Sequence, residues 1–188
     1  MSKRFPIPEF DRDQFKNLAW KAPTLLSDSE HARLLDAGHR GDASALGAYA
    51  VAVPSDTAQK YALVGPQLHA ILCVVPKKSL QVVGRSWAWP VQRALIVDSL
   101  ESQKSQVLAD WVTPRPMSTR LGPQDGIDVM GGAFYVITTH RYGQTWIGNR
   151  TLTTCAADAQ GGSLEVRSAC GEDVNDFHAC NVSVRWSS

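Results

Sequence analysis

Short apolar runs of strand length, separated by proline and glycine, dominate the chain between residues 45 and 97. Runs of this length, bounded by turn residues, predict buried β-strands. The first run is rich enough in alanine that a helix remains an alternative there. The runs are Ala45–Val53, Ala62–Val64, Leu68–Val75, Leu80–Val83 and Ala94–Val97.

After residue 133 the pattern changes to β-branched and aromatic residues. The segments Phe134–Arg141 and Thr145–Thr154 flank Tyr142-Gly143-Gln144, which predicts a β-hairpin. Two later segments, Leu164–Cys170 and His178–Trp186, alternate between apolar and polar positions, as strands with one buried face do. The pattern therefore predicts an antiparallel sheet over residues 133–188.

Three segments combine a polar start with apolar residues at helical spacing. The clearest begins with Ser27 and Glu30, a capping-box pair, and reaches Gly38, where a left-handed C-terminal cap is expected. The third carries an apolar stripe that ends before a proline. The segments are residues 11–22, 27–37 and 98–111.

These elements predict an α+β fold, with a mainly antiparallel sheet and two or three short helices in one compact domain over residues 1–188. The stretch Thr113–Gly132 is rich in proline and glycine and has no periodicity, which predicts a long loop. Long loops inside compact domains often carry function. We therefore expect functional residues in this stretch rather than a domain boundary.

Composition and charge narrow the functional classes. Hydrophobic residues make up 44% of the chain and charged residues 20%, which is typical of a folded domain. The formal net charge of +1 gives no excess of basic residues for a nucleic acid or an anionic membrane. The N-terminus lacks the apolar stretch of a signal peptide, so we expect a cytoplasmic protein with reduced cysteines.

Three cysteines and a histidine near the C-terminus, Cys155, Cys170, His178 and Cys180, are the residue types of a tetrahedral zinc site. Their spacing lacks the close pairs of structural zinc sites, and buried cysteines are common as small apolar residues. A disulfide between Cys170 and Cys180 is a further alternative. Inert core thiols are the favoured interpretation, so we expect no metal and no cofactor.

Standard catalytic motifs are missing: the sequence has no phosphate-binding glycine loop and no serine nucleophile elbow. A small hydrolase or lyase is still a hypothesis, with His140 as the acid or base and Asp125 or Asp128 as its carboxylate partner. The sequence alone does not bring these three residues together in space.

A binding or assembly domain is the leading hypothesis. Trp87 and Trp89 fall on one face of an extended segment beside Arg85, which suits stacking on a planar or sugar ligand or anchoring an interface. Arg141 and Tyr142, beside the predicted hairpin turn, could contact an anionic ligand at the rim of the sheet. The expected partner is a small molecule or a protein, and the chain could form a homo-oligomer.

Overall fold

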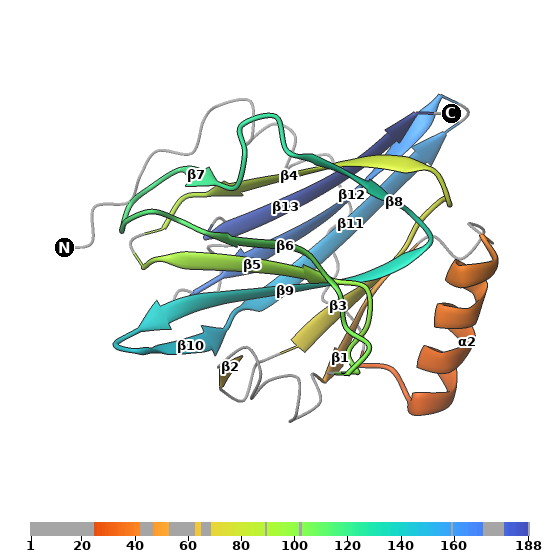
Figure 1. Ribbon diagram of the computed structural model, residues 1–188, viewed down its shortest axis with the longest axis horizontal. Coiled ribbons are helices and arrows are strands. Elements are labelled where there is room, and N and C mark those ends of the chain that lie inside the picture. The colour runs from red at the N-terminus through yellow and green to blue at the C-terminus, as the bar shows by residue number, and fades with distance from the viewer. Residues whose placement is uncertain are drawn as a thin grey trace.

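The apolar runs and alternating segments pair into two β-sheets that face one another (Figure 1). The computed structural model describes residues 25–41, 47–52, 63–64, 69–88, 90–101, 103–158, 160–170 and 179–187. Each sheet has one face turned to the other sheet, so alternate side chains of each strand meet in the space between them.

The first sheet has seven strands arranged around β9. On one side β9 pairs with β3 and β10, and on the other with β5; Val136 lies opposite both Ile71 and Ile96. All pairings are antiparallel except that of β10 with β2. The strands are β1 (Gly47–Ala52), β2 (Leu63–Val64), β3 (His69–Val74), β5 (Gln92–Val97), β6 (Val107–Val112), β9 (Ala133–Tyr142) and β10 (Thr145–Gly148).

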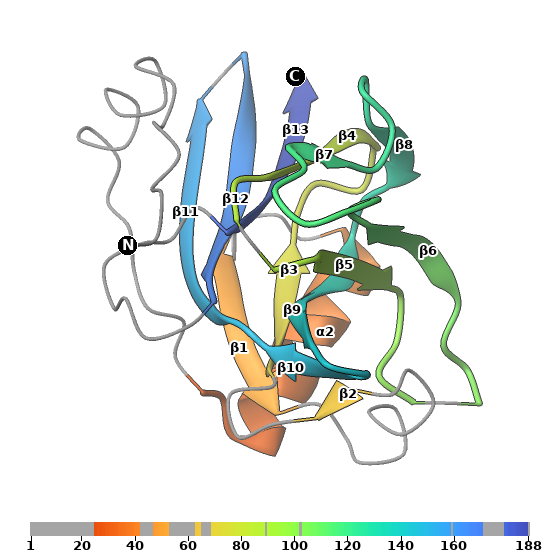
Figure 2. The same ribbon diagram turned by 90° about the vertical axis from the view of Figure 1, so that its left-hand side faces the viewer.

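The second sheet has six strands, all antiparallel, in the order β11, β12, β13, β4, with β7 and β8 both pairing with the far side of β4. Figure 2 shows β11, β12 and β13 side by side at one side of the molecule, away from β6. The strands are β4 (Ser79–Ser86), β7 (Arg120–Leu121), β8 (Ile127–Met130), β11 (Arg150–Asp158), β12 (Gly161–Ala169) and β13 (Cys180–Ser187).

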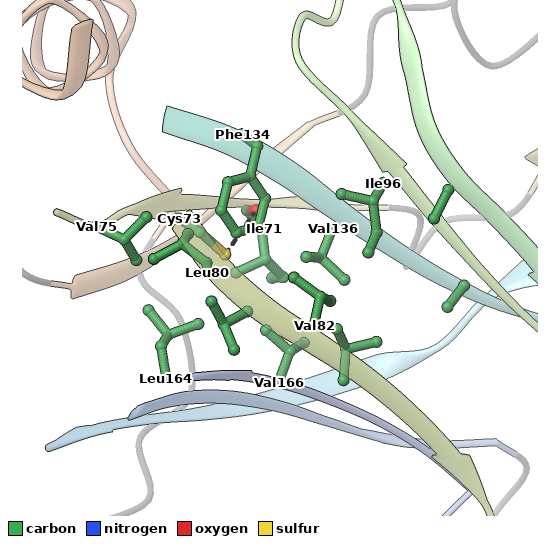
Figure 3. Close-up of a cluster of buried hydrophobic side chains, with 14 of the residues drawn as sticks. Ile71, Cys73, Val75, Leu80, Val82, Ile96, Phe134, Val136, Leu164 and Val166 are labelled. Carbon is green, nitrogen blue, oxygen red and sulfur yellow. Dashed lines mark hydrogen bonds between the residues drawn. The ribbon is translucent and has the colours of Figure 1, made fainter. Parts of the chain in front are cut away.

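The main hydrophobic core lies between the two sheets (Figure 3). Branched aliphatic side chains and the Phe134 ring fill it, and each buried side chain of this size contributes about 1.5–3 kcal/mol by leaving water. The Cys73 thiol donates a hydrogen bond to the carbonyl of Ile71, 3.7 Å away. The core includes Ile71, Cys73, Ile96, Phe134 and Val136 from one sheet and Leu80, Val82, Leu164, Val166, Val182 and Val184 from the other.

The helix α2 (Asp28–Arg40) covers the outer face of the seven-stranded sheet and encloses a second, smaller core there. Its capping box at Ser27 and Glu30 confirms the sequence-based prediction of a helix start. The predicted end at Gly38 is wrong: Gly38 lies inside the helix, where a Cβ would meet that of Ala133 at 2.7 Å. The left-handed cap is Gly41, with φ of 79°.

His31 attaches α2 to the sheet through a 2.5 Å hydrogen bond between its Nε2 and the Tyr135 hydroxyl. Burial lowers the pKa of His31 below its usual value, and Asp28 raises it by a smaller amount. Burial, with a smaller effect of Glu101, raises the pKa of Tyr135 to about 12, so the phenol stays protonated. Burial therefore favours a neutral imidazole at this contact.

His31 binds its proton more weakly in the folded chain than in the unfolded chain. Its contribution to the stability of the fold is therefore fully present above the unfolded pKa of about 6.5. It falls as the pH drops through the lowered pKa. We expect His31→Gln to flatten this dependence, measured as the free energy of unfolding from about pH 8 to about pH 5. An unchanged slope in the variant would show that another group titrates.

The expected α+β fold with two or three helices is wrong. The structure is mostly β, and α2 is the single helix of the described residues. The predicted helix at residues 11–22 lies outside the described residues. Among the helices that the structure describes, none is long and apolar enough to cross a membrane.

The predicted helix at residues 98–111 is also wrong, because its second half is strand β6. The Asp98 N–H donates to the Gln106 carbonyl, and the Asp98 carboxylate accepts from the Gln106 N–H, so the chain turns between them. Ala109 and Trp111 then face the core, while Asp110 faces outward. Pairing with β5 and burial of one face outweigh the local helical spacing.

Two other boundaries differ from the sequence prediction. The stretch 113–132, expected as a long loop, contains the short strands β7 and β8, which pair with β4. The segment Thr145–Thr154, expected as one strand, divides at Asn149 into β10 and β11, which belong to different sheets. The hairpin at 142–144 is confirmed, since Tyr142 pairs with Thr145.

Candidate functional site

A hollow opens at the side of the sandwich, where the edge strand β6 of one sheet lies near β7 of the other. Figure 2 shows β6 at the outer edge of its sheet. We call this site the edge hollow; its volume is about 300 Å³, at the lower end for small-molecule sites. Its lining residues are Asp110, Trp111, Val112, Pro114, Arg120 and Gly122.

The Trp111 indole, which lines the hollow, packs against two glycines. A Cβ at Gly84 would lie 2.9 Å from Cε3 of Trp111, and one at Gly122 would lie 2.5 Å from its Cδ2. Trp111 is 8% exposed, so it belongs to the core and also lines the hollow. Two positions without side chains therefore let a large aromatic ring lie close to the backbone of β4 and β7.

Asp110 and Arg93 form an ion pair beside the hollow. Nε of Arg93 donates to Oδ1 of Asp110 and its Nη2 donates to Oδ2, both at 2.8 Å. The Arg93 side chain is 11% exposed and that of Asp110 is 39% exposed. This two-point contact orients the carboxylate and leaves it open to solvent on its far side.

The same arginine continues into a cation–π cluster on the outer face of the seven-stranded sheet. The Cζ atoms of Arg93 and Arg141 lie 5.5 Å and 5.9 Å from the centre of the Trp146 ring. The sequence analysis proposed Arg141 as a ligand-binding residue. In the structure its guanidinium packs against the Trp146 ring. This packing holds Arg93, and through it Asp110, in place.

Arg120, on β7, contributes the other charge of the hollow. It is exposed, and among the described residues its guanidinium has no hydrogen bond or ion pair. The segment that leads to it contains Met117, a non-glycine residue with φ of 64°. Such backbone conformations cost about 1–3 kcal/mol and concentrate at functional sites.

The edge hollow therefore combines three kinds of chemistry. Its lining includes an acidic residue, Asp110, and a basic residue, Arg120, and Trp111 with Pro114 supplies apolar surface. The lining residues include no serine, cysteine or histidine, and the set is suited to holding a small polar molecule rather than to breaking its bonds.

A second hollow of about 480 Å³ lies near the start of β12, beside Gly162, Ser163, Arg185 and Trp186. It is larger than the edge hollow. Its lining has an arginine but no carboxylate, so it offers fewer directed contacts to a ligand. We prefer the edge hollow because its lining has both an acidic residue and an arginine, and Arg93 holds the Asp110 carboxylate in a defined orientation.

The structure places His140 in a buried polar network at the end of the core. Its Nδ1 lies 2.7 Å from Oδ1 of Asn149, whose Nδ2 donates to Oε1 of Gln92 at 3.1 Å. Because the Asn149 amide donates through nitrogen to Gln92, its oxygen accepts from a protonated His140 Nδ1. The Gln92 amide also donates to the thiol of Cys170 at 3.5 Å.

The two proposed loop carboxylates lie elsewhere. Asp125 precedes β8 and Asp128 lies on it, opposite Gln81 of β4 in the six-stranded sheet. β8 ends at Met130, and β9 begins three residues later at Ala133. His140 lies seven residues further along β9, about 23 Å from the start of that strand. The structure does not bring these carboxylates to His140, and the catalytic roles of the three residues stay untested.

The remaining predicted ligand-binding residues are dispersed. Arg85 donates to the backbone carbonyls of Gly84 and Gln124. Trp87 is partly buried just after β4, and its backbone N–H donates to the Ala179 carbonyl. Trp89 lies outside the described residues. Tyr142 ends β9, and its side chain lies outside the described part of the chain.

Cys155 and Cys180 lie too far apart to bind one zinc ion together. Cys155 pairs with Leu164 and Cys180 with Ser168, so they are separated by four positions, or about 13 Å, along the sheet. His178 lies outside the described residues. Burial raises the pKa of both thiols, which favours the protonated form over the thiolate that metals bind.

Sequence reasoning missed the residues of the edge hollow. Asp110 and Trp111 belong to the segment expected to be a helix, and Arg120 to the stretch expected to be a loop. The available signal was the pair Gly84 and Gly122, since glycine next to or within a strand often marks a close approach of another group. Nothing in the sequence indicated that Trp111 is that group.

Three solved bacterial lectins resemble part of this chain. A high-affinity mannose-binding lectin of Ralstonia solanacearum is 14% identical, with a TM-score of 0.49 over 65% of this chain and 97% of the lectin. Lectin CV2L of Chromobacterium violaceum, in complex with alpha-methyl-fucoside, is 16% identical, with a TM-score of 0.42 over 58% and 88%. The C-terminal domain of the lectin BC2L-C from Burkholderia cenocepacia is 16% identical, with a TM-score of 0.43 over 59% and 89%.

No protein-family model matches the sequence, and no curated protein matches it significantly. Because all three TM-scores are below 0.5, the likeness to these lectins carries no argument about the function of this chain. The functional conclusion rests on the edge hollow.

Proposed function

We propose that this chain is a ligand-binding domain, and that the edge hollow binds a small polyhydroxylated molecule the size of one sugar ring. The observation that carries the proposal is the edge hollow, whose lining combines an aromatic residue, an acidic residue and an exposed arginine. Each oxygen of the Asp110 carboxylate accepts one hydrogen bond from Arg93 and keeps a further lone pair for a ligand hydroxyl. An acceptor held in this way needs little reorganisation when a ligand arrives.

The other lining groups support the same ligand class. A sugar ring has C–H groups on its faces and hydroxyl groups around its rim. The Trp111 ring and Pro114 match the faces, while Asp110 and Arg120 match the rim. A volume of about 300 Å³ accommodates one ring rather than an extended chain.

A small hydrolase or lyase centred on His140 has less support. The described hydrogen-bond partner of His140 is the amide of Asn149. Asp125 lies just before β8 and Asp128 lies on it, in the other sheet. An amide orients an imidazole but does not stabilise its positive charge as a carboxylate does. Binding of a protein partner or of a second copy of the chain stays a prediction.

The test is a titration of the protein with glucose, mannose and galactose, followed by NMR at the Trp111 indole N–H. We expect at least one sugar to shift this signal, and Asp110→Asn to weaken that sugar about tenfold, because one charge-assisted acceptor is lost. Asp128→Asn, an exposed carboxylate on β8, is the matched control. No shift with any sugar, or equal affinities of the two variants, would refute the proposal.

A further inference from the structure

Strand β6 has one open edge. Among the described strands only β5 pairs with it (Figure 2). The Thr113 N–H donates to the Gln92 carbonyl, and successive residues of an antiparallel strand turn their peptide groups to opposite sides. The peptide groups of Asp110 and Val112 therefore face away from β5, and they have no described partner. An edge of this kind is a template for another strand.

Edge strands are usually protected against such pairing by bulges, prolines or charged side chains, and β6 has this protection only at its two ends. A shift of register against β5 marks its start, and Pro114 follows its end. Between them, Ala109–Val112 contains neither lysine nor proline. Its one charged side chain, Asp110, is neutralised by two 2.8 Å hydrogen bonds from Arg93. The middle of the edge is therefore open to pairing.

The edge hollow lies along this open edge. Residues 110–112 of β6 all line it, although successive side chains of a strand point to opposite faces of the sheet. The strand therefore borders the hollow with its edge rather than with one face. A strand added to β6 would point every second side chain inward, toward the apolar surface of Trp111 and Pro114.

We propose that β6 binds an extended peptide as an additional strand, and that one apolar side chain of this peptide enters the edge hollow. Main-chain hydrogen bonds to Asp110 and Val112 supply affinity that is independent of the peptide sequence, and the hollow supplies the selection for an apolar residue. The proposal does not rest on sugar binding, although a peptide and a sugar would compete for the hollow.

A second copy of this chain fits the same edge less well. The inward side chains of β6, Ala109 and Trp111, are buried in the core of their own molecule, so neither is available to the hollow of a partner. Pairing two β6 strands centred on Asp110 would also place two carboxylates opposite one another, which is destabilising. A peptide whose apolar side chain is free avoids both problems.

The probe is the peptide Lys-Val-Thr-Leu-Thr-Val-Lys, acetylated and amidated at its ends, in which the three apolar side chains share one face. It is titrated into the full chain and followed by NMR. We expect the amide signals of Asp110 and Val112 to shift and their hydrogen exchange to slow, because both N–H groups gain an acceptor. The same peptide with alanine in place of leucine should bind about tenfold more weakly.

Val112→Pro separates edge pairing from folding. The Val112 N–H faces away from β5, so proline at this position removes no hydrogen bond of the sheet, as in natural edge strands. The affinity for the peptide should fall at least about fivefold, because a donor is lost and the proline ring occupies the open side. Val112→Thr keeps the N–H and is the matched control. Thermal unfolding checks that both variants fold.

Two methylated peptides test the same pairing with the protein unchanged. One is N-methylated at both threonines, and the other at the leucine and both valines. Because alternate N–H groups of a strand point to opposite edges, each peptide loses the donors of one edge. Only one of the two should keep its affinity for the chain.

The outcomes decide between the occupants of the edge. If no amide of β6 responds, if Val112→Pro binds as tightly as the unchanged chain, or if both methylated peptides bind equally, the proposal is wrong. Self-association of the free chain with the same amides protected would replace the peptide by a second copy. A sugar that shifts the Trp111 signal while the peptide fails to bind refutes this inference and leaves the proposed function standing.

Discussion

Replacing Phe134 by alanine is expected to lower the free energy of unfolding by about 3–5 kcal/mol. The ring is 1% exposed and packs between the two sheets beside Cys73 and Val136 (Figure 3). Its removal loses the transfer free energy of a large aromatic side chain and leaves a cavity that β9, the central strand, is unable to close. Denaturant unfolding monitored by circular dichroism measures the effect.

Met130→Ala is the control for this prediction. Met130 is the last residue of β8 and is 67% exposed, so its truncation should change the free energy of unfolding by less than about 0.5 kcal/mol. If the two variants lose similar stability, the space between the sheets is not the main core.

Replacing Gly122 by alanine is expected to cost about 2–4 kcal/mol of stability and to abolish ligand binding in the edge hollow. Gly122 has φ of 77°, which L side chains rarely adopt, and the added Cβ would lie 2.5 Å from Cδ2 of Trp111. Displacing the indole from β7 adds the cost of overpacking, about 1–3 kcal/mol, to the backbone strain. Unfolding curves and the NMR sugar titration measure the two effects.

Gly143→Ala separates the two causes. Gly143, at the hairpin turn, also has a positive φ, of 61°, but a Cβ added there would meet no atom within 4 Å. This variant should therefore cost only the conformational term, about 1 kcal/mol, and leave the hollow intact. If both variants lose the same free energy of unfolding, the close contact between Trp111 and position 122 does not contribute to the cost.

Local signals in the sequence succeeded where the structure is held together locally. The capping box at Ser27 and Glu30 starts α2 because its hydrogen bonds join residues three apart. The turn at 142–144 joins β9 and β10 because Gly143 supplies the positive φ of a tight hairpin. Both features depend on neighbours in the chain.

The sequence failed where pairing across the molecule decided the outcome. Leu100, Val107 and Trp111 show helical spacing, but Trp111 belongs to a strand because it pairs with Ala94 of β5 and packs under Gly122. The two halves of the segment 145–154 enter different sheets, which no local pattern indicates. Non-local hydrogen bonds and burial of one face outweighed the local preference.

The sequence by itself determined that most of the chain forms short buried strands, that one capped helix follows residue 27, and that a hairpin turns near Gly143. Only the tertiary structure decided how the strands divide between two sheets and which residues meet at their edge. Asp110, Arg120 and Arg93 come from three strands, and their contacts depend on strand order and register. The candidate site therefore becomes visible only when the two sheets pack together.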